Sequence, residues 1–125
     1  MPCVIREGDA TTTGGVVLQT SGTLAWEDVR VARMGDPVWC EQCREVGFIA
    51  QGNPTFIDQL LAVATAGQAV RCSCAEGSNR LIASQDQLKA DMDASINIPK
   101  DLAEKSRKRA KLMTKTLRDA SPDKA

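Results

Sequence analysis

The chain contains no histidine and no tyrosine, and its aromatic side chains are limited to two tryptophans and two phenylalanines. Without histidine there is no imidazole to act as general base for a cysteine nucleophile, so that class of catalytic site is excluded. The scarcity of aromatic residues removes the largest side chains that a core normally uses. At 125 residues the chain is at most one ordinary domain, and a small domain with a poor core is hard to stabilise by burial alone.

The chain also lacks the segments that direct a protein to or across a membrane. No stretch approaches the roughly 18 consecutive apolar residues that a spanning helix needs. The N-terminal MPCVIREGDA has no basic patch followed by an apolar run, so no secretory signal peptide is expected. The formal net charge is +0, which gives no general attraction to nucleic acid or to an anionic membrane. We therefore expect a protein made in the cytoplasm, without a stable membrane anchor and without a nucleic-acid partner.

The balanced charge hides two parts of different character. Residues 1–85 carry 6 basic and 9 acidic side chains, a net of −3, whereas residues 86–125 carry 10 basic and 7 acidic ones, a net of +3. The first part is rich in short Val and Ile runs bounded by glycine, which predicts β-strands joined by tight turns. The second part predicts a charged, largely helical C-terminal extension. We expect a body at 1–85 and this extension at 86–125.

Two stretches of the extension carry the helical prediction. The segment DQLKADMDAS at 86–95 has helical composition, and PKDLAEKSRKRAKLMTKTLRDA follows from Pro99. Pro99 and Asp101 suit the start of a helix, and basic residues follow downstream. The apolar stripe is narrow and comprises Leu102, Ala110, Met113 and Leu117. The basic run KSRKRAK has no interleaved aromatic residue, which favours a solvated helix face or a protein-docking surface over a nucleic-acid site.

An internal repeat organises the body. The stretches VIREGDATTTGG, VARMGDPVWCEQC and VATAGQAVRCSC align, with Gly8, Gly35 and Gly67 at the equivalent place. Asp9 and Asp36 follow the first two glycines, and Gln68 follows the third. Glycine at such a position predicts a positive φ, and the aspartates predict hydrogen bonds back to the turn rather than catalysis.

Four of the five cysteines lie in two close pairs. Cys40 and Cys43 form a C-x2-C pair, and Cys72 and Cys74 form a tighter C-x-C pair. Cys40 and Cys72 stand at equivalent positions five residues after their turn glycines, where the first repeat has Thr13. Four thiolates close a tetrahedral site, and zinc suits four sulfurs. The sequence predicts one structural zinc site, with the Thr13 hydroxyl beside it.

Two other interpretations of the cysteines remain open at this point. A thioredoxin-like redox role for Cys40 and Cys43 would require a βαβ setting, which the all-β pattern does not favour. The other interpretation is that the thiols are inert core groups, because free cysteine often behaves as a small hydrophobe. Cys3 has no close partner in the sequence, and simple burial in the first strand is the expectation for it.

The Gly-Asp-type turns at this spacing resemble the PAAR-repeat family, and GDATTTGG, MGDPVWCEQC and GNPTF carry the match over about residues 3–85. The resemblance implies a small pseudo-threefold β-cone with a metal near its apex. It also implies a structural rather than enzymatic role at the tip of a type VI secretion spike. There, one monomer would cap and sharpen a trimeric β-helical spike protein for membrane puncturing and be exported with it.

The chain departs from the family pattern in its ligands. Family members commonly place a histidine just before the first Gly-Gly, where this chain has Thr13, and another where Cys43 stands. A family-style site would therefore be built from cysteines here, or no metal is bound. Residues 86–125 are expected to be a docking element for the spike, an effector or an adaptor. The alternative is a zinc-ribbon-like module for nucleic acid or protein, although a ribbon has no use for three repeats, and a phage tail is an alternative setting for a spike tip.

Overall fold

The structure is a computed structural model, and it describes residues 1–119. Residues 120–125, the end of the predicted C-terminal extension, lie outside this range. Within residues 1–119 the elements are β1 (Val16–Val17), β2 (Ala25–Trp26), β3 (Val29–Arg30), β4 (Pro37–Cys40), β5 (Glu45–Ile49), β6 (Gln51–Asp58), β7 (Leu61–Val63), β8 (Val70–Arg71), β9 (Ile96–Asn97) and α1 (Lys100–Asp119).

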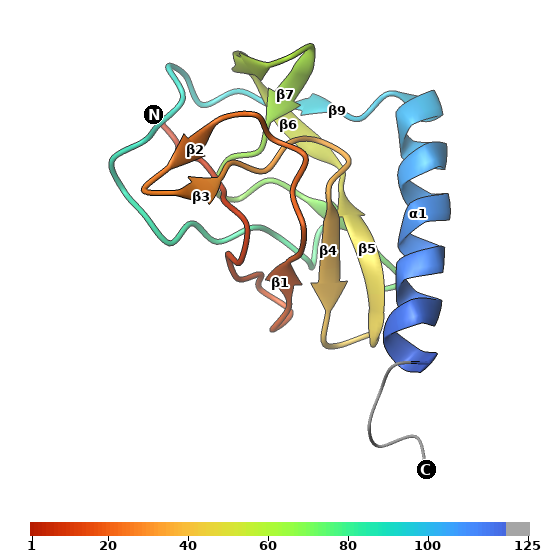
Figure 1. The fold of residues 1–125 in the computed structure, drawn as a ribbon. Coiled ribbons are helices and arrows are strands. Elements are labelled where there is room, and N and C mark those ends of the chain that lie inside the picture. The colour runs from red at the N-terminus through yellow and green to blue at the C-terminus, as the bar shows by residue number, and fades with distance from the viewer. Residues whose placement is uncertain (120–125) are drawn as a thin grey trace.

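The strands form three small antiparallel sheets. Their strand orders are β1-β4-β5-β8, β2-β3 and β7-β6-β9, and within the described residues none of them closes into a barrel. Figure 1 shows the sheets gathered into one body, with α1 running along the side formed by β4 and β5. The predicted fold class, mostly β with short strands and a C-terminal helix, is confirmed.

The three predicted glycine turns have the same backbone geometry. Gly8, Gly35 and Gly67 have φ angles of 88°, 97° and 86°, a region that side chains rarely tolerate. The residue after each glycine also bonds back to the turn as expected. Its side-chain oxygen accepts a 2.8 Å hydrogen bond from the backbone N–H three residues earlier, at Asp9, Asp36 and Gln68. The prediction that Asp9 and Asp36 serve turn architecture is confirmed.

A closed ring of backbone hydrogen bonds joins the three repeats. The Ile5 amide donates to the Ala64 carbonyl at 2.9 Å, Ala64 donates to Ala32 at 2.9 Å, and Ala32 donates to Ile5 at 2.8 Å. Each repeat therefore binds the next in the same way, which is the signature of a pseudo-threefold axis. The preceding residues, one from each repeat, are fully buried together: Val4, Val31 and Val63.

The main core lies around this axis and uses small aliphatic side chains. Its members come from all three repeats and are Ile5, Val17, Ala32, Val38, Ile49, Ala64, Val70 and Leu81. A second cluster lies between the body and α1 and contains Met34, Phe48, Ala50, Ala62, Ile98 and Ala103. The two clusters explain how the chain folds with so few aromatic residues, since most of their members are short aliphatic side chains that pack closely together.

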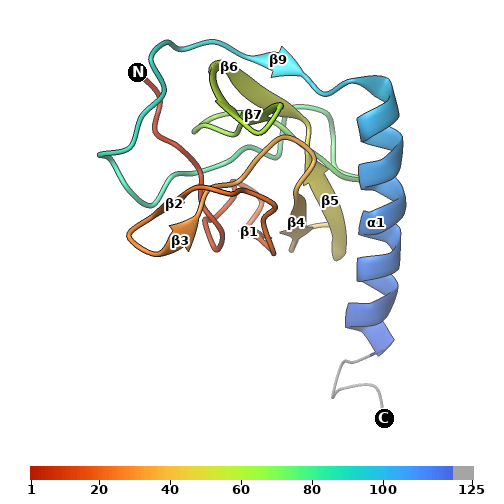
Figure 2. The same ribbon diagram turned by 45° about the horizontal axis from the view of Figure 1, so that its top comes forward.

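The β6–β7 hairpin extends from the body at the end away from the β4–β5 turn, and the β2–β3 hairpin projects from the side of the body (Figures 1 and 2). The β2–β3 turn has positive φ at Glu27 and Asp28, and the β6–β7 turn has positive φ at Gln59 and Leu60. Two consecutive residues of this kind are typical of the tight type I′ turn, whose twist suits a β-hairpin.

The helix predicted at 86–95 is wrong. This segment has irregular backbone and runs along the body: Lys89 forms a β-bridge with Cys3, and the Ala90 amide donates to the Pro2 carbonyl at 3.0 Å. The Gln85 side chain accepts hydrogen bonds from the amides of Gln87 and Leu88, which competes with a helical backbone. Pairing with the N-terminal segment around Cys3 thus overrides the local helical preference of these residues.

The predicted second helix does form, as α1. Pro99 directly precedes it, its carbonyl accepts from the Ala103 amide at 2.9 Å, and Asp101 lies in the first turn. The predicted stripe is correct in part, because Ala110 is buried and Leu102 packs partly buried against the second cluster. The other buried residues of the helix are small ones outside that stripe: Ala103, Ser106 and Thr114. Leu117 is instead 44% exposed. Small side chains let the helix lie close against β5, where the Thr114 hydroxyl accepts from the Val46 amide at 2.9 Å. In the described part of the chain, no helix has the length and apolar character needed to cross a membrane.

Candidate metal centre

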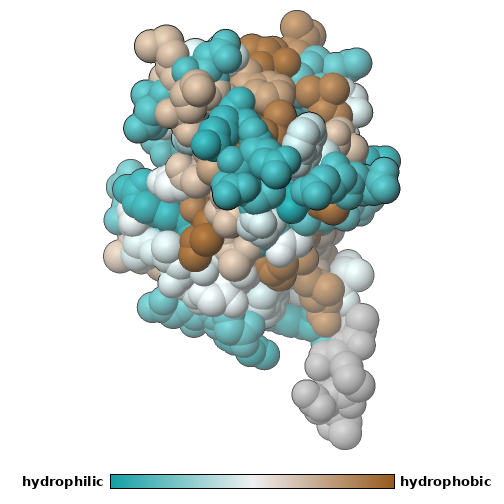
Figure 3. Space-filling view, turned by 90° about the vertical axis from the view of Figure 1, so that its left-hand side faces the viewer, coloured by the Kyte–Doolittle hydropathy of each residue, from teal (hydrophilic) through white to brown (hydrophobic). Residues whose placement is uncertain are grey.

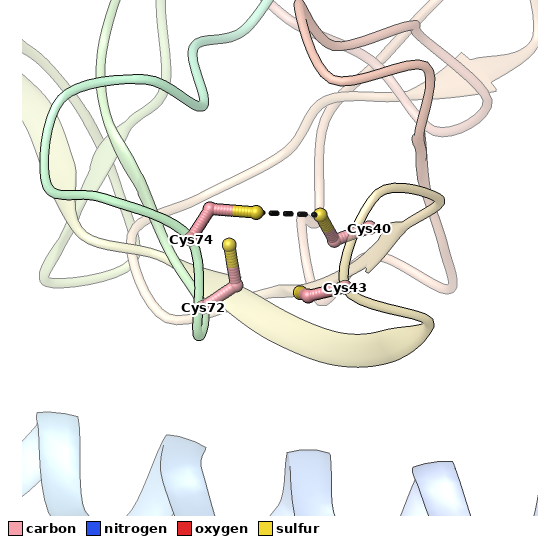
Figure 4. Close-up of side chains that lie close together, drawn as sticks. All are labelled: Cys40, Cys43, Cys72 and Cys74. Carbon is pink, nitrogen blue, oxygen red and sulfur yellow. Dashed lines mark hydrogen bonds between the residues drawn. The ribbon is translucent and has the colours of Figure 1, made fainter.

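Four cysteine side chains converge at the end of the body that holds the β4–β5 turn. Cys40 ends β4, Cys43 lies in the following turn, and Cys72 and Cys74 follow β8. Their sulfur atoms all lie within 4.8 Å of one another. Figure 4 shows the two pairs facing each other from two separate loops. The structure therefore brings together all four of the residues that the sequence analysis selected as ligands.

Sheet register explains why the two pairs meet. Strand β5 pairs with β4 on one side, with Cys40 opposite Glu45, and with β8 on the other, with Phe48 opposite Arg71. The loops that leave β4 and β8 therefore emerge at the same edge, one on each side of the start of β5. The first loop turns tightly at Arg44, which has a φ of 57°.

Gly47 allows the two loops to come this close. A Cβ atom at this position would lie 2.2 Å from the Arg71 carbonyl oxygen and 3.0 Å from the Cys72 Cβ. Only a residue without a side chain lets β8 approach β5 here. Gly15 has the same relationship to the second repeat, since its Cβ would lie 1.8 Å from the Trp39 carbonyl oxygen. The repeat thus places one glycine at each of two inter-repeat contacts.

The sulfur spacing suits a four-coordinate metal. A tetrahedral ion with metal–sulfur bonds of about 2.3 Å places its sulfurs about 3.8 Å apart. The Cys40 and Cys74 Sγ atoms are 3.6 Å apart, and the dashed line in Figure 4 marks this contact. All five cysteines of the chain are free thiols. A small inward adjustment of the widest pair would complete the tetrahedron.

Neighbouring polar groups hold the sulfurs in place. The Thr13 hydroxyl lies 3.3 Å from the Cys40 Sγ, so the predicted position of Thr13 beside the site is confirmed. The Asn79 side-chain amide donates to the Cys72 Sγ at 3.5 Å. Glu45 accepts from the Ser73 amide at 2.8 Å and from the Cys43 thiol at 3.6 Å, which ties the two loops together. Hydrogen bonds of this kind fix ligand orientation around a metal.

The four thiols do not share the same acidity. Burial works to raise the pKa of Cys40, but hydrogen bonds from Thr13, Cys43 and Cys74 outweigh it and lower the pKa from 9.0 to about 7. Burial raises the pKa of Cys43, and the hydrogen bond with Cys40 adds to the increase. Burial and the contact with Cys40 also raise the pKa of Cys74, to about 11. The Cys40 thiolate is therefore stabilised by the thiols of Cys43 and Cys74, which keep their protons.

Metal binding by these cysteines requires them to lose protons. Thiolates rather than thiols bind metal, so an incoming cation has to displace the protons of Cys43 and Cys74. Cys40 supplies the first thiolate near neutral pH. The cluster is therefore suited to stepwise capture of a soft divalent cation, with proton release.

The other interpretations of the cysteines fit the geometry less well. Cys40 and Cys43 lie on a β-hairpin rather than in a βαβ unit, the setting of thioredoxin-like redox pairs. Inert core thiols would be buried, but Cys43, Cys72 and Cys74 are all partly exposed. Cys3 stands apart from the cluster. It forms a β-bridge with Lys89 and is only partly buried, so the predicted burial holds in part.

Sequence reasoning missed three residues that shape this centre: Glu45, Gly47 and Asn79. The repeat carried a signal for two of them, because Gly15, Gly47 and Asn79 follow one another at intervals of 32 residues. Where the third repeat has Asn79 in place of glycine, its side chain turns to the Cys72 sulfur. Glu45 has no equivalent in the pattern, and only the fold reveals its role.

Two comparisons with known proteins gave different results. No curated protein matches the chain. A family model described as the PAAR motif matches residues 7–76, which is more than half of the chain. The matched segment includes all three glycine turns, Thr13 and the four clustered cysteines. The chain therefore belongs to the PAAR motif family.

Proposed function

We propose that the protein is the tip of a contractile injection spike of the type VI secretion kind. One chain caps a trimeric β-helical spike protein and narrows it to a point that punctures a membrane. The observation that carries this proposal is the ring of hydrogen bonds through Ile5, Ala32 and Ala64. A chain with three equivalent units can match a threefold partner without forming a trimer itself. Family membership supports the same role.

The end of the body away from the β4–β5 turn offers a surface for the spike. Large hydrophobic side chains are exposed on or beside the two hairpins and the 86–95 segment: Leu24, Ile57, Leu60 and Met92. Leu60, in the β6–β7 turn, is 95% exposed. In Figure 3 brown surface gathers at the upper end of the molecule, at the height of the β6–β7 hairpin in Figure 1. Exposed apolar groups of this number, mixed with polar ones, are typical of a docking surface.

We assign zinc to the four-cysteine centre as a structural ion. Zinc prefers four-coordinate sulfur sites, and four thiolates leave no open position for a water molecule. The centre lies at the β4–β5 end of the body, away from the proposed spike surface (Figure 1). A tapering end has little volume for an apolar core, and a metal can replace that core. This role requires stability rather than catalysis, so no enzymatic activity is proposed.

The helix is proposed as a second docking element, for an effector or an adaptor. It carries eight of the ten basic residues in residues 86–125, and its buried face fixes it to β5. A rigid helix presents its outer side chains in a fixed arrangement. The protein would fold in the cytoplasm, assemble on the spike and leave the cell with it.

Binding to a purified trimeric spike protein tests the proposal. Leu60→Asp places a charge at the most exposed apolar position of the hairpins and should weaken binding at least about tenfold. Leu112→Asp is the matched control, because Leu112 is 67% exposed but lies on the helix. Equal binding by both variants, or no binding by the unmodified protein, would reject the proposed spike surface.

A further inference from the structure

A groove of about 650 Å³ runs between the helix and the sheet. One wall is α1, and the other is formed by β5 and the residues around the end of β8. Its apolar lining includes Val46 and Phe48, and Thr114 joins the helix to β5 through the Val46 amide. The volume lies within the roughly 300–1,000 Å³ that is usual for ligand sites.

The groove is strongly basic. Its lining contains five cationic side chains, Arg71, Arg107, Lys111, Lys115 and Arg118. The lining also contains two acidic side chains, Glu45 and Asp119, so the cations outnumber the acids by five to two. The Glu45 carboxylate already accepts from the Ser73 amide and the Cys43 thiol. Within residues 1–119 the ion pairs are Arg6–Glu27 and Arg44–Glu41, so none of the five cations is neutralised by a salt bridge there.

Two of these cations are held in place by one aromatic ring. The guanidinium carbons of Arg71 and Arg107 each lie 5.8 Å from the centre of the Phe48 ring. Phe48 itself is buried. Arg71 comes from β8 and Arg107 from α1, so the ring brings together two like charges from different elements. Stacked guanidiniums keep their N–H groups available for a carboxylate, which they bind in a fork-like geometry.

The far end of the groove is also fixed. Arg118 donates to the Arg44 carbonyl at 3.0 Å, which links the last turn of α1 to the β4–β5 turn. Lys111 and Lys115 lie between the two ends on successive turns of the helix. The cations therefore form a line along the groove rather than a single point charge.

We infer that this groove binds an acidic peptide segment of a partner protein. A line of cations over an apolar floor suits alternating carboxylate and aliphatic groups of a peptide. A nucleic acid fits less well, because the groove has no exposed aromatic ring for base stacking. The inference rests on the proposed role of the helix as a docking element but is independent of spike binding.

Fluorescence anisotropy with a labelled hexaglutamate peptide tests the inference on the full-length protein, with hexaglutamine as the neutral counterpart. We expect hexaglutamate to bind, hexaglutamine not to bind, and the affinity to fall as salt is added. The double variant Lys111→Glu/Lys115→Glu should weaken binding by about tenfold or more. Lys105→Glu/Lys108→Glu has the same change in net charge on exposed helix positions outside the groove and should have little effect.

Several results would overturn the inference. They are absence of hexaglutamate binding, equal weakening by both double variants, and tighter binding of a single-stranded oligonucleotide of equal charge. The milder variant Lys111→Ala/Lys115→Ala repeats the test if the charge reversals disturb folding, which circular dichroism reports. Spike binding is measured on the same variants. If it persists while peptide binding is absent, only the groove assignment fails.

Discussion

The Cys40 and Cys74 sulfur atoms lie 3.6 Å apart although 34 residues separate them in the chain. Cys40 ends β4 and Cys74 follows β8, and these two strands pair with opposite sides of β5, so the sheet itself brings the two sulfurs together. The contact also joins the second repeat to the third. A metal bound here would therefore fix the relative position of two repeats beside the β4–β5 turn.

Replacing a ligand should remove metal and stability together. Structural zinc sites contribute about 10–16 kcal/mol of apparent binding free energy in small peptides, so even partial loss of the site is costly. We expect Cys40→Ser or Cys72→Ser to lower zinc content well below about one ion per chain and the melting temperature by about 10 °C or more. Elemental analysis and thermal unfolding check this.

Cys3→Ser is the matched control for these variants. Cys3 forms a β-bridge with Lys89 and is not among the clustered sulfurs. Its replacement should leave both zinc content and melting temperature nearly unchanged. If Cys3→Ser lowers them as much as Cys40→Ser does, the assignment of ligands is wrong.

The repeat pattern predicted much of this arrangement. Because Thr13, Cys40 and Cys72 stand at equivalent positions after their glycines, they had to approach a common axis. The structure confirms this, with the Thr13 hydroxyl 3.3 Å from the Cys40 sulfur. The turn roles of Asp9 and Asp36 followed from the same alignment. A repeat makes long-range contacts predictable, because the role of a residue in one unit indicates the role of the equivalent residue in the next.

Other features depend on contacts that the pattern does not encode. The 86–95 segment has helical composition, but its backbone donates a hydrogen bond to the Pro2 carbonyl and forms a β-bridge with Cys3 instead. The basic groove arises because Arg71 and Arg107 meet over Phe48, and their positions in the chain give no sign of this. Such contacts are set by tertiary packing, which overrides local propensity.

The Thr13 hydroxyl should tune the acidity of Cys40. Burial works to raise the Cys40 pKa, and hydrogen bonds, with Thr13 first among them, lower it to about 7. Thr13→Val removes that bond, so the pKa should rise and metal affinity should fall about tenfold near neutral pH. Thiolate absorbance of the metal-free protein measures the pKa, and chelator competition measures the affinity. Thr13→Ser keeps the hydroxyl and should behave like the unmodified protein, and a similar loss in both variants would contradict this role.

Gly47 should tolerate no side chain. Its Cβ would lie 2.2 Å from the Arg71 carbonyl oxygen, so Gly47→Ala must separate β5 from β8. We expect a loss of about 3 kcal/mol in the free energy of unfolding, together with weaker metal binding. Gly67→Ala is the comparison, because its φ of 86° is strained but no atom lies within 4 Å of the added Cβ. It should cost only about 1 kcal/mol, and urea unfolding that ranks the two variants the other way would refute the argument.

Asp58 should contribute stability that is lost in acid. Burial works to raise the pKa of Asp58, but hydrogen bonds from Thr23 and Leu24 and the charge of Arg33 hold it below its usual value. The folded carboxylate thus releases its proton more readily than the unfolded one. Its contribution is fully present above the unfolded pKa of about 3.9 and is lost as pH falls through the folded pKa.

Asp58→Asn should therefore cost about 2 kcal/mol near neutral pH. The difference from the unmodified protein should shrink as the pH falls below about 4. Urea unfolding across this pH range measures both effects. A difference that stays constant with pH would show that the ionised carboxylate is not responsible.

The most direct test of the proposed function is the mass of the assembled complex. Three equivalent units in one chain, joined through Ile5, Ala32 and Ala64, should occupy all three faces of a trimeric spike at once. Native mass spectrometry of the protein with its purified spike should therefore give one copy of this chain per spike trimer. Three copies per trimer, or no complex at all, would contradict the account.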